Sequence, residues 1–217
     1  MSLHIFFNVL AHLIQEDWNH VNVPCNLSNV SLEMLHTVSN KTIVSLNNCT
    51  YILTSPINIS SVQGLHIIGN SSVISCIGDN TGLMFTTVTE LLLENFTVLS
   101  CGLLLSEDNL KIASVKIENS MGVTIKNLSI ENGKGSGLSL VNVEGNVTVG
   151  DCNFTNNTYL VDQTYPNIDA IKNDFVQRGG GLQILMIDTK KCSSYKIFRC
   201  FFISLYFTSS DQHLFNQ

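Results

Sequence analysis

The sequence predicts an all-β fold, a parallel β-helix or solenoid of about five coils, and three observations support this prediction. A phrase built around an asparagine occurs four times at nearly regular intervals, starting at His66, Leu91, Val123 and Val147. A second phrase, Gly-Leu-x-apolar, also recurs, and the apolar residues fall in short runs rich in Val, Ile and Thr, which favour strands. A single repeat of this length cannot bury its own apolar face, so we expect the repeats to stack.

The asparagine phrase predicts two short strands on either side of a polar bend. In each copy an apolar residue stands third, Asn or Asp stands fifth, and Val, Ile or Phe stands eighth. Asn tolerates the left-handed backbone of a tight bend, and like amides can hydrogen-bond from coil to coil. The copies are His66–Val73, Leu91–Val98, Val123–Ile130 and Val147–Phe154. The expected column at the bend is Asn70, Asn95, Asn127 and Asp151. The expected inner stack is Ile67, Leu93, Ile125 and Val149.

The regular coils are expected within residues 47–187. Thr50–Leu53 and Ile57–Ile59 open the run of short apolar segments, and the repeated phrases continue it. Residues 159–178 interrupt the repeat, which predicts a loop insertion. The copies of the Gly-Leu phrase are Gly82–Phe85, Gly102–Leu105, Gly137–Leu140 and Gly181–Ile184.

The segments outside these coils do not follow the repeat. Residues 25–46 are interpreted as an amino-terminal cap, because an open end coil would expose unpaired backbone groups. Residues 1–24 contain a short apolar stretch without a preceding Lys or Arg, which fits a weak signal peptide or a truncated start. Residues 188–217 hold seven aromatic residues and no sequon, which predicts an irregular tail that offers a surface for self-association.

At its asparagine column the chain resembles the right-handed parallel β-helix of the pectin lyase-like superfamily, in which such columns line a tight turn. The resemblance covers residues 42–187. Phe154–Asn157 and Gly180–Leu182 are also similar to the Phe-x-x-Asn and Gly-Gly-Leu repeats of polymorphic outer-membrane-type β-helix proteins. The resemblance implies a right-handed parallel β-helix, and it does not by itself confer an activity.

Eleven Asn-x-Ser/Thr sequons exceed chance and predict an N-glycosylated chain that is secreted or held at the cell surface. A structural origin is the alternative, because Asn at the bend and Ser or Thr on the next strand produce the same tripeptide. Most of the sequons lie outside the bend position, which favours glycosylation. The sequon asparagines are Asn26, Asn29, Asn40, Asn48, Asn58, Asn70, Asn95, Asn127, Asn146, Asn153 and Asn156.

The seven cysteines support an oxidising compartment, in which disulfides persist. Cys76 and Cys101 follow equivalent bends in consecutive repeats, so about 4.8 Å of coil spacing would separate them, within reach of a disulfide. A ladder of small buried thiols is the alternative interpretation. Cys25 and Cys49 are candidates for a second pair, and one cysteine stays unpaired in any scheme.

Charge and hydropathy exclude several classes of function. The net charge is −6 and the Lys and Arg residues are scattered, so we predict no nucleic acid partner. The apolar runs fall short of the roughly 18 residues that a membrane helix needs, so we predict no transmembrane span. No Walker loop, dinucleotide fingerprint or His and Cys cluster is present, so we predict no cofactor and no metal site.

The catalytic sets of polysaccharide-cleaving β-helix enzymes are missing. The chain has no Asp-Asp pair, no Gly-His-Gly, and only two arginines, Arg178 and Arg199. Glu94 and Lys126 hold the same place in adjacent phrases, where they form a solvated cross-strand pair or face a sugar. We prefer the solvated pair, and His66 is expected to begin a strand with its ring half exposed.

The predicted insertion contains a further group of acidic residues that we considered as calcium ligands. Their spacing fits no known calcium loop, so loop solubility is the preferred interpretation. These residues are Asp162, Asp169 and Asp174.

We therefore expect a non-catalytic extracellular structural or recognition module whose ligand, a protein or a carbohydrate, lies along a flat sheet face. One alternative is a diverged polysaccharide lyase or glycoside hydrolase that uses Glu94, Glu118 or Asp151. Two of these carboxylates within about 5 to 10 Å on one outer face would favour it. The other alternative is a fragment of a longer surface protein, which further repeats after Ile187 in a longer transcript would support.

Overall fold

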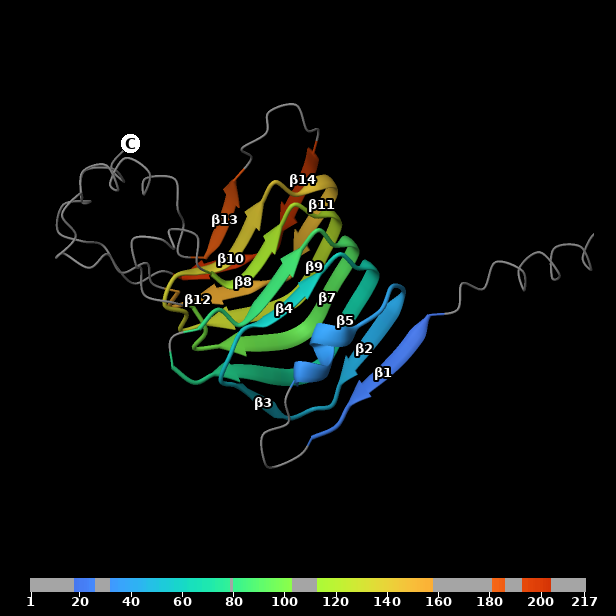
Figure 1. The fold of residues 1–217 in the computed structure, drawn as a ribbon. Helices are drawn as coiled ribbons and strands as arrows, with labels where there is room; N and C mark the ends of the chain where they lie inside the picture. Colours follow the sequence, from blue (N-terminus) through green and yellow to red (C-terminus); the bar gives the residue numbers. More distant parts are fainter. Residues whose placement is uncertain are drawn as a thin grey trace, which may run out of the picture.

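The structure is a computed structural model that describes residues 18–25, 32–78, 80–102, 113–157, 181–185 and 193–203. Its strands stack in chain order along one axis (Figure 1). All the strand pairs in these ranges are parallel, which agrees with the predicted all-β solenoid. No helix among the described residues is long and apolar enough to cross a membrane.

Two parallel sheets build the stack. The main path of the larger sheet is β1 (Asn19–Val23), β2 (Thr42–Leu46), β5 (Gln63–Cys76), β7 (Thr89–Leu99), β9 (Met121–Glu131), β11 (Glu144–Gly150) and β14 (Ser193–Phe198). Beside this path, the same sheet contains β3 (Thr50–Leu53), β12 (Asn153–Thr155) and β15 (Phe201–Ile203). The smaller sheet contains β4 (Ile57–Ser60), β6 (Leu83–Thr86), β8 (Ala113–Glu118), β10 (Ser136–Val141) and β13 (Leu182–Leu185).

The core lies between the sheets and is a set of columns of apolar side chains. Because side chains alternate along a strand and the strands are parallel and in register, each inward position meets its equivalents in the neighbouring coils. The central column is fully buried, and it consists of Val44, Ile67, Leu93, Ile125 and Val149. The chain thus buries its apolar face only by stacking.

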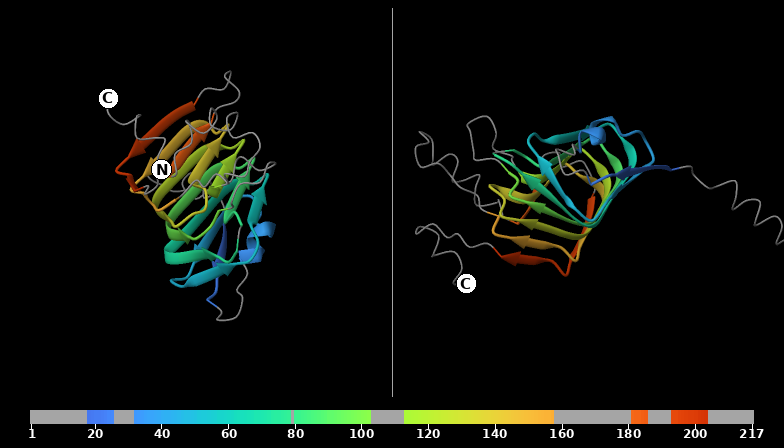
Figure 2. Two further views of the ribbon diagram at one scale, coloured as in Figure 1. Left: turned by 90° about the vertical axis from the view of Figure 1, so that its left-hand side faces the viewer. Right: turned by 90° about the horizontal axis from the view of Figure 1, so that it is seen from below.

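The long strands β5, β7 and β9 change direction along their length (Figure 2), and each does so at an asparagine. Asn95 and Asn127 have φ values of 61° and 48°, in the left-handed region that Asn tolerates. β5 contains two extra residues at this corner, since the register with β7 shifts between Ile68 and Ser72 and three residues of β5 stand opposite Asn95 alone. Two of these three, Asn70 and Ser71, have positive φ.

The amino-terminal end of the stack is covered by a short 3-10 helix, η1 (Leu32–Thr37). Leu32 and Leu35 are buried in the core, and His36 Nδ1 lies 3.0 Å from the carbonyl oxygen of Asn58 in β4. This segment lies within the predicted cap.

The stack is longer than predicted at both ends. Residues 19–23, which we grouped with a signal peptide or truncated start, form β1 and pair with β2. The prediction of an irregular tail is wrong for residues 193–203, because they form β14 and β15. There, Tyr195 pairs in register with Val147 and Ile197 pairs with Val149, so these two residues extend the inner columns by one coil. The predicted insertion at 159–178 and the sequons Asn26 and Asn29 lie outside the described residues.

Candidate functional site

The outer face of the larger sheet is lined by two rows of in-register side chains, which we call the outer rows. Their neighbours along each strand point into the core, so the outer rows are the side that remains available to a ligand. The first row is His20, Ile43, His66, Leu92, Thr124, Thr148 and Lys196. The second row is Asn22, Ser45, Ile68, Glu94, Lys126, Gly150 and Phe198.

A shallow depression of about 410 Å³ lies on the first outer row. His66 stands at this depression and is half-buried, and its ring lies against that of Trp18 with 4.4 Å between the centroids and a tilt of 35° between the ring planes. Burial lowers the pKa of His66, and the nearby carboxylates of Glu90 and Glu94 oppose this shift. An aromatic pair thus borders a depression that contains both apolar and polar side chains. The residues that line it are His66, Glu90, Leu91, Leu92, Gly122, Thr124 and Asn146.

Two cationic side chains and one aromatic ring lie close together at β14, the last strand of the outer rows. The ring of Phe198 lies over Gly150, where an added Cβ would be only 2.4 Å from the ring, so this close approach requires glycine. Lys196 Nζ and Arg199 Cζ lie 5.4 and 5.2 Å from the centroid of the same ring. Such distances allow cation–π attraction.

The structure brings Asn70, Asn95, Asn127 and Asp151 together at one corner of the coil, with φ values of 47°, 61°, 48° and 55°. Asn127 Nδ2 donates to Asn95 Oδ1 at 3.0 Å, so two of the amides form a ladder. Asn70 Nδ2 instead donates to the carbonyl oxygen of Leu46 at 3.0 Å, one coil earlier. The column therefore satisfies polar groups from coil to coil.

Arg199 extends this column and was not predicted to do so. Its φ is 48°, and its guanidinium binds the carboxylate of Asp151 with nitrogen to oxygen distances of 2.5 and 2.7 Å. The hydrogen bond from Arg199 holds the pKa of the Asp151 carboxyl below its usual value. An ion pair thus replaces the amide ladder in the last described coil.

Two further asparagine ladders stand at other corners and were missed. Asn142 Nδ2 donates to Asn119 Oδ1 at 3.2 Å, and Asn156 Nδ2 donates to Asn132 Oδ1 at 3.3 Å. All four residues have positive φ. The sequence separation within each pair is close to one repeat, and it is the signal that could have revealed these ladders.

Both candidate cysteine pairs are joined, each between consecutive coils. Cys76 and Cys101 have a Cα–Cα distance of 5.0 Å, and Cys25 and Cys49 one of 6.1 Å. Cys152 and Cys200 remain free thiols, of which Cys152 is buried. Disulfides of this kind are typical of an oxidising environment.

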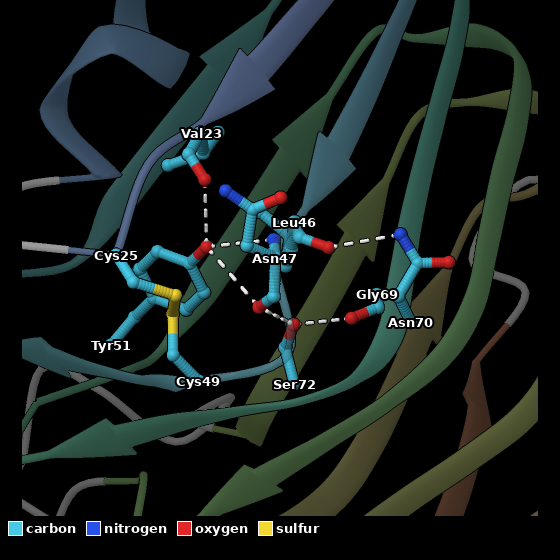
Figure 3. Close-up of a disulfide and its surroundings, with 9 residues drawn as sticks. All are labelled: Val23, Cys25, Leu46, Asn47, Cys49, Tyr51, Gly69, Asn70 and Ser72. Carbon is cyan, nitrogen blue, oxygen red and sulfur yellow. Dashed lines mark hydrogen bonds between the residues drawn. A yellow bond between two sulfur atoms is a disulfide. The ribbon is translucent and has the colours of Figure 1, made fainter.

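The Cys25–Cys49 bridge lies beside a buried polar network (Figure 3). Tyr51 Oη donates to the carbonyl oxygen of Val23 and accepts from the Asn47 amide, both at 2.9 Å. Ser72 Oγ donates to the Asn47 carbonyl oxygen at 2.5 Å, and it also bonds the carbonyl oxygen of Gly69. Burial raises the pKa of Tyr51. The network ties together three coils of the amino-terminal end.

The sequon asparagines divide into two groups. Three of them use Nδ2, the atom to which a glycan attaches, as a donor to another coil, and these are Asn70, Asn127 and Asn156. Asn95 is half-buried and accepts the bond from Asn127. The remaining described sequon asparagines are solvent-exposed, and within the described ranges their Nδ2 atoms donate no bond to another coil; they are Asn40, Asn48, Asn58, Asn146 and Asn153.

The carboxylates of the enzyme hypothesis do not share one face. Glu94 stands in the second outer row, where Lys126 is its register partner. Glu118 belongs to the smaller sheet and binds Lys116 Nζ at 2.6 Å. Asp151 lies at the asparagine corner and is paired with Arg199.

The structure describes only part of the chain in which a metal site could be sought. In the part of the chain that the structure describes, no three His, Cys, Asp or Glu side chains are grouped to hold a metal ion. The acidic residues Asp162, Asp169 and Asp174 lie outside the described residues.

Three of the residues that carried the second family resemblance, Phe154, Asn157 and Gly181, lie in or against the core of the coil. Phe154 and Asn157 are buried, and the Asn157 amide donates to the Ile130 carbonyl oxygen at 2.7 Å and accepts from the Gly133 amide at 3.1 Å. Gly181 lies against Phe154, since a Cβ added to it would be 3.1 Å from the Cβ of Phe154. These residues serve the core of the coil rather than a surface site.

Comparison of the chain with models of protein families, with curated proteins and with solved structures found no match. A functional conclusion must therefore come from the geometry described above.

Proposed function

We propose that the chain is a non-catalytic extracellular recognition or structural module of the pectin lyase-like β-helix type. It is N-glycosylated on the exposed sequons whose Nδ2 atoms donate no bond to another coil, and it binds a protein or carbohydrate ligand on the outer rows. The observation that carries this proposal is the pair of disulfides between consecutive coils, because such bonds persist in oxidising compartments such as the extracellular space.

The sequons supply the second line of support. Five of the described sequon asparagines are exposed and keep Nδ2 out of the coil-to-coil bonds, so a glycan would leave the rod without disturbing it. We expect occupancy at these sites and little at Asn70, Asn95 and Asn127, where the amides belong to the corner column. The glycans would also keep a chain of low charge in solution.

The outer rows support recognition because they repeat one side-chain position about every 4.8 Å along a flat parallel face. An extended ligand lying along the axis would meet several of them in register. The first row contains both apolar and polar groups, with Ile43 and Leu92 on either side of His66 and polar residues from Thr124 onward. This mixture suits a ligand that offers both apolar surface and hydrogen-bonding groups.

Binding by the secreted, full-length chain tests the proposed face. We expect binding to a panel of immobilised glycans and extracellular proteins, and about a tenfold loss of affinity, roughly 1.4 kcal/mol, in a His66→Ala, Leu92→Ala variant. The matched control is Val73→Ala, Ser75→Ala, because both residues are also half-buried on the larger sheet but lie beyond the asparagine corner and belong to no sequon. Equal affinity of the outer-row variant and the control would refute recognition through the outer rows.

A further inference from the structure

The two free cysteines that the structure describes occupy equivalent positions in consecutive coils. Cys152 follows Asp151 and Cys200 follows Arg199, the two ion-paired residues with φ of 55° and 48°. The Phe201 amide donates to the Cys152 carbonyl oxygen at 2.8 Å, and the strands that follow pair in parallel. The two cysteines are therefore neighbours along the axis although they lie far apart in the sequence.

Their side chains point the same way. Each thiol hydrogen-bonds the carbonyl oxygen two residues before it, at 3.2 Å for Cys152 and 3.4 Å for Cys200. Each also faces a carbonyl oxygen one coil earlier, that of Ile125 at 4.0 Å and that of Val149 at 3.6 Å. The Cα atoms of two such residues lie about 4.8 Å apart, the spacing of adjacent strands. That spacing falls within the range of roughly 4.4 to 6.8 Å that disulfides span.

The same molecule already closes this kind of bond. Cys76–Cys101 joins consecutive coils over a Cα–Cα distance of 5.0 Å. Cys101, like Cys152 and Cys200, comes directly after a corner residue with positive φ, since Ser100 has φ of 56°. The coil geometry at such a corner is thus compatible with a cross-coil disulfide after rotation about the side-chain bonds.

We propose that Cys152 and Cys200 form a third disulfide, which fastens β14 and β15 to β11 and β12. This inference depends on the extracellular location proposed above, because it requires an oxidant. The oxidant is a disulfide of the secretory compartment, of the glutathione or protein type. One Sγ–Sγ bond forms and the disulfide bond of the oxidant breaks, and the two electrons and both thiol protons pass to the oxidant, which leaves as two thiols.

The order of the two exchange steps follows from exposure. Cys200 is half-buried whereas Cys152 is buried, so Cys200 takes up the oxidant as a mixed disulfide and Cys152 then displaces the second thiol. Burial raises the pKa of the Cys152 thiol to about 12, so little thiolate is present once the coil is packed. The second step is therefore expected while the last coil docks, when Cys152 is already the less accessible thiol but is not yet fully covered.

Peptide mapping of the secreted full-length chain tests the proposal. After glycan removal and without reduction, trypsin separates the three remaining cysteines into residues 135–172, 192–196 and 200–217. We expect a linked pair of 135–172 and 200–217, and alkylation of the unfolded, unreduced chain at one cysteine, Cys192, rather than at three. In Cys200→Ala the Cys152 thiol should become alkylated, whereas the matched variant Cys192→Ala should keep the linked pair.

Two results would overturn the proposal. The first is alkylation of both Cys152 and Cys200 while Cys76–Cys101 and Cys25–Cys49 are bridged, which leaves the extracellular proposal standing. The second is a link from either residue to Cys192 in the wild-type map. If instead all seven cysteines are alkylated in the properly secreted chain, both this inference and the disulfide argument for an extracellular module fail.

Discussion

Replacement of Asn127 separates the structural role of the corner column from glycosylation. Asn127 has φ of 48° and donates from Nδ2 to Asn95 Oδ1 at 3.0 Å. Asn127→Ala places a residue that disfavours left-handed backbone at the corner, at a cost of about 1 to 2 kcal/mol. It also deletes one hydrogen bond, and because Asn127 is exposed we take the lower end of the usual range, about 0.5 kcal/mol.

The expected loss for Asn127→Ala is therefore about 1.5 to 2.5 kcal/mol, or roughly 3 to 10 °C in Tm for a chain of this size. Asn127→Gly loses the same hydrogen bond but accepts the positive φ, so its cost should stay at about 0.5 kcal/mol. Ser129→Ala is the matched control, because it destroys the sequon and leaves the Asn127 side chain in place. It removes the 2.6 Å bond from Ser129 Oγ to Glu131, a part-buried contact for which we also take the lower end of the usual range, about 0.5 kcal/mol.

Thermal unfolding of the secreted variants, followed by circular dichroism, measures these differences. The predicted order of Tm is wild type, then Ser129→Ala and Asn127→Gly close together, and Asn127→Ala lowest. If Ser129→Ala lowers Tm as much as Asn127→Ala, the glycan and not the column stabilises this corner. If Asn127→Gly is as costly as Asn127→Ala, the argument from left-handed backbone is wrong.

Three further results are expected. Ile125→Ala should lower the free energy of chemical unfolding by about 2 to 5 kcal/mol, because Ile125 is fully buried. Thr124→Ala, on the outer face, should change it by no more than about 0.5 kcal/mol. Similar losses in the two variants would contradict the alternation of inner and outer positions. Removal of the Cys76–Cys101 bridge by double substitution to Ala should cost about 2 to 4 kcal/mol, and an unchanged midpoint of unfolding would show that the bridge adds no stability. The pKa of His66 is lower in the folded chain than in the unfolded chain. The contribution of neutral His66 to the free energy of unfolding is therefore complete above about pH 6.5, and it is lost as the pH falls through the folded pKa. His66→Phe should flatten this acid loss, and parallel pH profiles of the two proteins would exclude His66 as its source.

Periodic features of the fold could be predicted from sequence because stacking forces equivalent residues into equivalent environments. Leu93, Ile125 and Val149 are buried in one column because each stands two residues before its corner residue. Ile67 joins this column although it stands three residues before Asn70, because β5 has extra residues at its corner. The corner itself was recognisable because Asn is favoured where the backbone is left-handed.

The ends of the stack could not be predicted because they lack these markers. Arg199 occupies the corner where the other coils have Asn or Asp, so the phrase is not recognisable in β14. Burial is also incomplete there, with Ile197 and Phe202 at 43% and 50% exposure although they continue inner columns. The apolar alternation alone was too short to identify a coil.

The residues of the outer rows could not be predicted from the sequence either, because the register between strands decides which residues belong to a row. The step along the chain from Leu91 to its partner Val123 is longer than the neighbouring steps of the stack, and β5 contains two extra corner residues. Each of these irregularities shifts the alignment of one coil with the next by a number of residues that the sequence does not reveal. Only the pairing of strands shows that His66, Leu92 and Thr124 face the same side.

The most direct test of the proposal that this solenoid is extracellular and glycosylated is site-resolved glycan occupancy in the full chain expressed through a secretory pathway. Enzymatic release of N-glycans in heavy-oxygen water marks each occupied asparagine as a labelled aspartate, which peptide mass spectrometry then locates. We predict labels at exposed sequons such as Asn48, Asn58, Asn146 and Asn153, and few or none at the column residues Asn70, Asn95 and Asn127. A secreted chain without label at any sequon would contradict the account, as would labels concentrated on the column.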